Sequence, residues 1–139
     1  MEDTQKFFNA IRNGNENIVS ELLAENPNLI RAKDQRGSTS LILATYYDQK
    51  SIVELLLSIG AVIDEKDAAG NTALMGVCFK GFKDLAKMLI EKGANVNVRN
   101  AMGGTCLIYA TTFNQPDIAR LLVENGAEIS AKDNKGNTA

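Results

Sequence analysis

Few residues of this chain are of the types that carry out chemistry. Its 139 residues include no histidine, which excludes the Ser-His-Asp and Cys-His catalytic arrangements and removes the commonest zinc ligand. The two cysteines, Cys78 and Cys106, are 28 positions apart and form no CxxC motif. We interpret both as small packing residues of a hydrophobic core, because buried thiols behave as small apolar groups.

Two glycine-containing segments resemble ligand-binding loops in part. Gly76 and Gly81 have the spacing of a phosphate-binding loop, but residues 82–84 read Phe-Lys-Asp, where that loop needs Lys followed by Ser or Thr. Residues 133–136 lack the alternating carboxylates of a calcium-binding loop. The sequence therefore predicts no catalytic residue, no cofactor and no metal site, and we expect the protein not to be an enzyme.

The composition predicts one folded domain with no strong attraction to nucleic acid. Hydrophobic residues make up 45% of the chain, enough for a packed core, and the net charge is -2, whereas phosphate binding needs a concentrated positive surface. No apolar run approaches the roughly 18 to 20 residues of a membrane span. The polar segment from Met1 to Gln5 does not resemble a secretory signal, and unpatterned cysteines suit a reducing compartment, so we expect a cytoplasmic protein.

A period of 33 residues organises the chain. Four glycines share it, and threonines, leucines and Gly-Ala pairs follow the same step. The positions are Gly37, Gly70, Gly103 and Gly136; Thr39, Thr72, Thr105 and Thr138; Leu41, Leu74 and Leu107; and Gly60-Ala61, Gly93-Ala94 and Gly126-Ala127. Several independent positions with one period indicate a repeat protein, in which each unit is one supersecondary element.

Each unit has the local signals of a turn followed by two helices. It opens with Asp or Asn three residues before the shared glycine, a combination typical of tight turns. The threonine two residues after that glycine predicts a helix N-cap. Two short helices with apolar stripes follow, and Gly60, Gly93 or Gly126 is predicted to end the second helix in the left-handed conformation. Helices this short are marginal alone, so only the stacking of units can bury their apolar surfaces.

The first helix of each regular unit opens with a similar motif. Residues 39–44, 72–77 and 105–110 read TSLILA, TALMGV and TCLIYA. These motifs resemble the opening of the ankyrin repeat, T-P-L-H-x-A, without its Pro and His. In the family that His links neighbouring turns, so we expect weaker polar coupling between turns here, where Ile42, Met75 and Ile108 replace it.

The resemblance covers nearly the whole chain. It implies an all-α ankyrin-repeat solenoid of stacked helix-turn-helix units, joined by β-turn or hairpin-like loops, as a single domain over residues 1–139. The units are a divergent N-terminal capping repeat at 4–33, regular repeats at 34–66, 67–99 and 100–132, and the start of a further repeat at 133–139. In the capping repeat Ile18 belongs to the apolar stripe of the second helix, and Asn26-Pro27 replaces the Gly-Ala stop. Nothing caps the last helix pair, so either the natural chain continues or a partner or second copy covers this end.

In ankyrin-repeat proteins the turn tips and the first helices form a concave binding surface, and the resemblance implies the same surface here. We call it the concave face. Aromatic residues on it carry most weight, because they are enriched at energetically important interface positions. The alternative is that some of these rings pack between neighbouring helices. The predicted partner-binding residues are Arg12, Asn13, Gln35, Arg36, Ser38, Tyr46, Tyr47, Ala69, Asn71, Phe79, Lys80, Met102, Thr112 and Phe113.

A series of cations has the same period as the turns. Lys33, Lys66, Arg99 and Lys132 each precede the Asp or Asn that opens a unit. Such a row could attract an acidic segment of a partner. Exposed ion pairs contribute only about 0 to 1 kcal/mol, however, and a regular charge series is usually a solvated edge, which is the interpretation that we favour.

These observations favour a non-catalytic protein–protein interaction module. It would bind a partner protein through the concave face and regulate or inhibit that partner. The alternative is a structural, self-associating repeat fragment whose open C-terminal end mediates assembly. Neither nucleic acid nor a membrane is expected as a partner.

Overall fold

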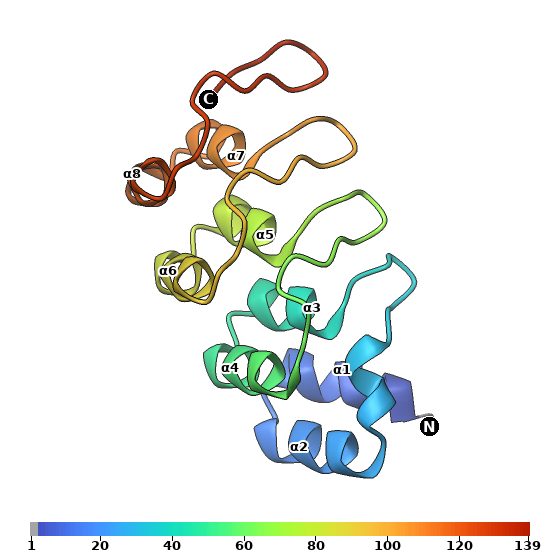
Figure 1. Cartoon of the computed structure of the whole chain (residues 1–139). Coiled ribbons are helices and arrows are strands. Elements are labelled where there is room, and N and C mark those ends of the chain that lie inside the picture. Colours follow the sequence, from blue (N-terminus) through green and yellow to red (C-terminus); the bar gives the residue numbers. More distant parts are fainter. Residues whose placement is uncertain (1–2) are drawn as a thin grey trace.

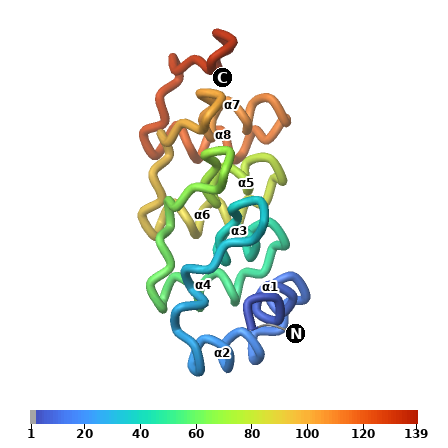
Figure 2. Tube along the Cα trace, turned by 90° about the vertical axis from the view of Figure 1, so that its right-hand side faces the viewer, coloured from blue at the N-terminus to red at the C-terminus, as the bar shows by residue number. Residues whose placement is uncertain are grey.

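The computed structural model describes residues 3–139, so the first two residues of the predicted polar segment at Met1 to Gln5 lie outside the described residues. Four pairs of antiparallel helices are stacked in chain order from the N-terminus to the C-terminus, as Figures 1 and 2 show. The pairs are α1 (Asp3–Asn13) with α2 (Glu16–Glu25), α3 (Ser40–Tyr46) with α4 (Lys50–Ile59), α5 (Ala73–Lys80) with α6 (Lys83–Glu91), and α7 (Cys106–Thr112) with α8 (Pro116–Glu124). This arrangement confirms the predicted all-α solenoid.

The first helices of the pairs lie on one side of the stack and the second helices on the other. In Figure 1 the loops that precede α3, α5 and α7 project beyond the first helices, away from α2, α4, α6 and α8. The first helices pack on one another in the order α1, α3, α5, α7. Among residues 3–139 the loops contain no named strand, and an isolated bridge joins Lys33 to Thr39. No helix in the same range is long and apolar enough to cross a membrane.

Threonine begins the first helix of each regular pair. The Oγ1 atoms of Thr39, Thr72 and Thr105 accept hydrogen bonds from backbone N–H groups three residues later, at 3.1, 3.4 and 3.2 Å. Each bond satisfies one of the N–H groups that have no partner inside the helix. The predicted N-caps are therefore confirmed. Each helix start is determined by a hydrogen bond between residues three positions apart.

The opening Asp or Asn of each unit holds the turn together. The Oδ1 atom of Asp34 accepts hydrogen bonds from the N–H groups of Arg36 and Ser38, both at 2.9 Å. Asp67, Asn100 and Asp133 make the equivalent pair of bonds. Within the first turn Gly37 has a φ of 76°, and a Cβ added there would lie 2.8 Å from the backbone nitrogen of Ala68. Glycine is thus needed both for the turn and for the close approach of the next turn.

Successive turns are linked by polar groups other than the missing histidine. Backbone N–H groups of Ala101 and Asn134 donate to carbonyl oxygens of the preceding turn, at 3.0 and 2.8 Å. The side chain of Asn100 also donates to Oδ1 of Asn71 at 2.8 Å. Met75, at the position where the ankyrin motif has His, is fully buried, as expected for an apolar contact. Polar coupling between turns therefore runs through the backbone and through asparagine side chains.

A continuous hydrophobic core runs along the stack between the two rows of helices. Its largest fully buried side chains are Phe7, Ile11, Val19, Leu41, Ile52, Leu56, Leu74, Met75, Leu85, Leu89, Ile118 and Leu122. In the first unit α2 ends without a glycine, and the short 3-10 helix η1 (Pro27–Arg31) places Leu29 in the same core. The core therefore has no single centre, and each unit contributes a layer to it.

Ile18 lies on the apolar stripe of α2 but is not covered by a described neighbouring unit. Its side chain is 40% exposed, whereas the equivalent residues Ile52 and Ile118 are each 1% exposed. Both of these follow another unit in the stack, and no described unit precedes α2. The apolar stripe is therefore fully buried only where a neighbouring unit lies against it.

Two Gly→Ala substitutions are expected to change stability in opposite directions. Gly93 follows α6 with a φ of 98°, so Gly93→Ala should lower the free energy of unfolding by about 1 kcal/mol through backbone strain. Gly76 lies inside α5, and a Cβ there would meet no atom within 4 Å, so Gly76→Ala should raise it by about 0.5 to 1 kcal/mol. Urea unfolding followed by circular dichroism measures both. Because the two variants gain the same methyl group, equal effects would contradict the two backbone assignments.

Candidate functional site

A groove of about 490 Å³ crosses the concave face between the first three units. It lies over the ends of α1, α3 and α5 and is bordered by the turns that precede α3 and α5. The residues that line it are Arg12, Asp34, Gln35, Arg36, Ser38, Ile42, Leu43, Tyr46, Tyr47, Asp67, Asn71, Thr72, Gly76 and Phe79. The concave face is thus hollowed in its N-terminal half, where the chain can surround part of a ligand.

Eight of the fourteen predicted partner-binding residues line this groove. They are Arg12, Gln35, Arg36, Ser38, Tyr46, Tyr47, Asn71 and Phe79. Ser38 is nearly buried, because its backbone is held by Asp34 inside the turn, so it offers little surface. The structure brings together residues from three successive units, spread over positions 12 to 79 of the sequence.

The other six predicted residues lie outside the groove. Lys80 and Phe113 contact residues that line it, or the rings beside it, and so extend the same surface. Met102 is exposed at a turn tip, and Asn13 is exposed at the end of α1. The remaining two are partly engaged within the fold: the Thr112 hydroxyl donates to the carbonyl of Ile108 at 2.7 Å, and the Ala69 carbonyl accepts from Ala101.

The aromatic residues divide into exposed rings and packed rings. Tyr46, Tyr47 and Phe113 are 49%, 43% and 48% exposed. Phe79 is half-buried, with its ring centroid 4.3 Å from that of Tyr109 and 5.1 Å from that of Phe113. The packing of Phe79 against Tyr109 of α7 agrees with the alternative interpretation for this ring, which also lines the groove. The three exposed rings stay predicted binding residues.

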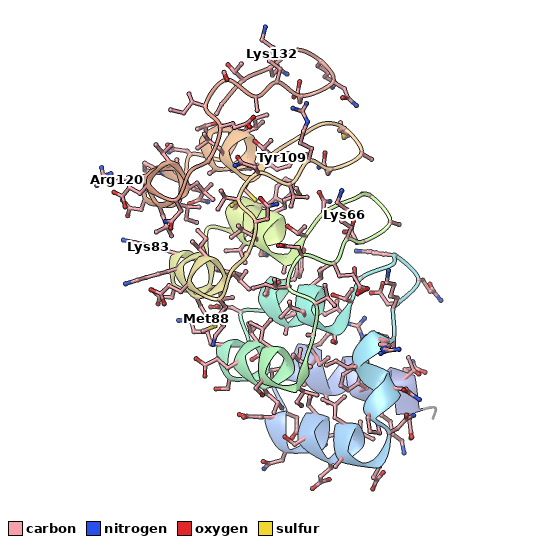
Figure 3. The ribbon with its side chains drawn as sticks, viewed as in Figure 1. Lys66, Lys83, Met88, Tyr109, Arg120 and Lys132 are labelled. Carbon is pink, nitrogen blue, oxygen red and sulfur yellow. The ribbon has the colours of Figure 1, made fainter. Side chains whose placement is uncertain are left out.

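Tyr109 is the contact that sequence reasoning missed. Its ring packs on Phe79, and its hydroxyl accepts a hydrogen bond from the side chain of Asn100 at 2.6 Å. Figure 3 shows Tyr109 on the side of the stack from which the turns project, opposite Lys83 and Arg120. The 33-residue step from Leu43 through Gly76 to Tyr109 was the available signal, since these positions face the same way in their helices.

The periodic cations before the turns contact the next unit of the stack. Lys33 pairs with Glu65 at 3.4 Å, and Nζ of Lys66 donates to the carbonyl of Arg99 at 3.2 Å. The guanidinium of Arg99 donates to the carbonyl of Lys132. These contacts join consecutive turns at an exposed edge, in agreement with the interpretation that we favoured.

A second row of ion pairs joins the second helices. Lys50 lies 3.0 Å from Asp84, and Lys83 lies 3.5 Å from Asp117. The hydrogen bond and charge of Lys50 lower the pKa of Asp84, and those of Asp84 raise the pKa of Lys50. The pair is therefore lost as the pH falls through the pKa of Asp84 or rises through that of Lys50. Both groups are fully exposed, so the pair adds little to stability.

The two thiols are adjacent to each other inside the core. Cys78 and Cys106 are both unpaired and fully buried. The hydrogen bond with Cys106 and the burial of the group raise the pKa of Cys78 well above its ordinary value. The reactive thiolate is therefore scarce at neutral pH. No group of three His, Cys, Asp or Glu residues in the described range could hold a metal ion.

We expect both thiols to react with Ellman's reagent at pH 8 only after the protein unfolds. In the folded state their modification should be at least about 100-fold slower than in guanidinium chloride, because the reagent must wait for the core to open. The absorbance of the coloured thiolate that the reagent releases measures the modification rate in both states. Rapid modification of either cysteine in the native protein would show that its thiol is accessible and would contradict this assignment.

Comparison with protein families agrees with the geometry. The family model described as ankyrin repeats in three copies matches residues 5–67 and 59–133, which together span most of the chain. No curated protein sequence matches this chain. Ankyrin repeats are generally protein–protein interaction modules, and the family is typically non-catalytic. With its stacked helix pairs, capped turns and 33-residue period, the chain belongs to the ankyrin-repeat family.

Proposed function

We propose that this protein binds a partner protein through its concave face. The observation that carries the proposal is the groove between the first three units, bordered by the exposed rings of Tyr46 and Tyr47. The concave face presents no recognisable catalytic group among the described residues, so binding would act on the partner by occupancy, as regulation or inhibition. We also retain the cytoplasm as the predicted compartment.

The energetics favour the concave face over the second-helix face. Large rings that are half exposed in the free protein can bury much apolar area on binding, and such residues dominate many interfaces. The groove is lined by α-helices and hydrogen-bonded turns, so little conformational entropy is lost when a partner binds. On the second-helix side the exposed ion pairs would have to be desolvated, which opposes burial.

The test compares three forms of the protein in affinity enrichment from a lysate of the source cells. The concave variant carries Tyr46→Ser, Tyr47→Ser and Phe113→Ser. It leaves Phe79 intact, because that ring also packs on Tyr109. We expect the concave variant to retain the partner at least about ten-fold less than wild type, since the loss of buried aromatic contacts costs 1 kcal/mol or more per residue.

The control variant carries Ile18→Ser, Ile59→Ser and Val62→Ser, which also replace three exposed apolar residues, outside the concave face. It should retain the partner as well as wild type does. Circular dichroism should show that all forms are folded. Equal loss in the concave and control variants, or no loss in the concave variant, would reject the concave face as the binding site.

Self-association is the second candidate function, and the exposed C-terminal face of the last helix pair favours it. A largely apolar hollow of about 380 Å³ lies there, lined in part by Leu107, Val123 and Ile129. Ile129 is 61% exposed, whereas Val96, its equivalent one unit earlier, is 7% exposed because the next unit covers it. A second copy of the chain could cover the same surface.

Sedimentation velocity over a wide concentration range tests this candidate. If two copies pair through this face, the sedimentation coefficient should rise with concentration, and Val123→Glu with Ile129→Glu should abolish the rise by placing charges in an apolar contact. A wild-type protein that remains monomeric at all concentrations would exclude self-association.

A further inference from the structure

We propose that the groove on the concave face binds an acidic peptide segment that inserts one large apolar side chain beside Gly76. The inference rests on the proposed function, because it names the chemistry of the partner segment at that same site. Two features carry it: a hollow that packing does not require, and cations with no carboxylate partner.

The hollow comes from a glycine in the middle of a helix. Glycine at an interior helical position is less favourable than alanine, so some other demand must retain it. At Gly76 a Cβ would meet nothing within 4 Å, so the space directly beside the helix at this position is open. Leu43 and Tyr109 occupy the equivalent positions of α3 and α7. The glycine therefore leaves space open where the other units have a side chain.

Several apolar groups share the groove with Gly76. Ile42, Leu43, Tyr46 and Phe79 line the same groove as Gly76. A large aliphatic or aromatic side chain of a partner could contact all four and complete the packing that Gly76 leaves unfilled. Such an anchor, buried in a preformed pocket, is expected to supply most of the binding affinity.

Three cations lie in or beside the groove. Arg12 and Arg36 line the groove, and Nζ of Lys80 lies 4.6 Å from the ring centroid of Tyr46. The guanidinium of Arg12 donates to Asn9 at 3.1 Å, which leaves its charge uncompensated. Within residues 3–139 none of these three cations forms an ion pair with a carboxylate. They are available to carboxylates of a ligand.

The two acidic residues that line the groove, Asp34 and Asp67, accept hydrogen bonds from backbone groups of their own turns. Oδ1 of Asp34 accepts two backbone N–H groups of its own turn, and Oδ1 of Asp67 does the same. The positive ends of these N–H dipoles offset the carboxylate charges. Asp48, the acidic residue that follows Tyr47, does not line the groove. The two arginines and two aspartates of the lining balance in formal charge, and Lys80 beside Tyr46 adds a small positive excess. Because the carboxylates are engaged by the turns and the cations form no ion pair within the described chain, the groove complements an acidic segment.

The test uses a displayed library of random twelve-residue peptides, selected on the immobilised full chain. We expect enriched peptides to carry at least one large apolar residue and a surplus of Asp and Glu. Gly76→Leu should fill the hollow and weaken the selected peptides at least about ten-fold, while leaving the protein folded, since Leu43 is accommodated at the same position of α3. If Gly76→Leu binds the peptides more weakly while its free energy of unfolding is unchanged or higher, the loss comes from occlusion of the site and not from damage to the fold.

A charge variant tests the second half of the proposal. Arg36→Glu with Lys80→Glu should weaken the acidic peptides by about five-fold for each charge, with an effect that shrinks at high salt. The matched control is Lys87→Glu with Lys92→Glu, which changes the net charge equally at exposed positions on and beside α6. This control should bind the peptides as wild type does.

The outcomes separate the two proposals. Peptides that need Tyr46 and Tyr47 but carry no acidic surplus, or that bind the charge variant as well as wild type, would overturn the acidic-segment inference and leave the concave face as a binding site. Undiminished binding to Gly76→Leu would overturn the anchor. If no enriched peptide depended on concave-face residues, this inference and the proposed function would both fail.

Discussion

Burial between neighbouring units is the interaction on which the rest of this structure depends. Its helices have 7 to 11 residues, too few to persist alone in water. Each one persists because an apolar stripe is covered by its pair partner and by the units before and after it. The effect is visible where cover is missing, since Ile18 is exposed at one end of the stack and Ile129 at the other, while their interior equivalents are buried. Stability therefore resides in the contacts between units more than in any unit.

Because stability resides in the contacts between units, the exposed residues of the concave face are not constrained by the core. The turns are closed by Asp or Asn side chains and linked by backbone hydrogen bonds, so the residues between them need not contribute to folding. Tyr46 and Tyr47 can be large and exposed there without cost to the core. Phe79 marks the limit of that freedom, because the same ring packs on Tyr109 and lines the groove. A substitution of Phe79 would therefore disturb the packing of α5 on α7 as well as the groove.

In the proposed binding mode the groove would combine two kinds of recognition that differ in their contribution to the binding free energy. The apolar hollow at Gly76 can bury a side chain in a preformed space, which favours affinity. The cations beside it are exposed and interact weakly in water, so they favour orientation and discrimination between partners. A glycine inside α5 lowers the stability of that helix, and the open space is the only structural consequence that the described residues show for it.

What the sequence by itself determined is the part of the structure that short-range interactions control. The N-cap of Thr39 and the turn of Asp34 act over two to four residues, and the left-handed glycine after the second helix of each regular unit acts within one turn of backbone. These signals, repeated every 33 residues, were enough to predict the helix pairs and their stacking. The expected binding face came from the resemblance to the ankyrin repeat, and it stays a prediction. The local structure of each repeat can therefore be predicted from its sequence.

Only the tertiary structure decided which positions of that face form one site. The groove joins Arg12, Arg36 and Phe79 from three units, and Gly76, where a Cβ would meet no atom within 4 Å, lies in its lining. Burial of Phe79 by Tyr109, and exposure of Ile18, depend equally on what lies in the adjacent layer. The physical reason is that packing and exposure are set by neighbours one whole unit away in the chain. The size and position of those neighbours become known only when the units are stacked.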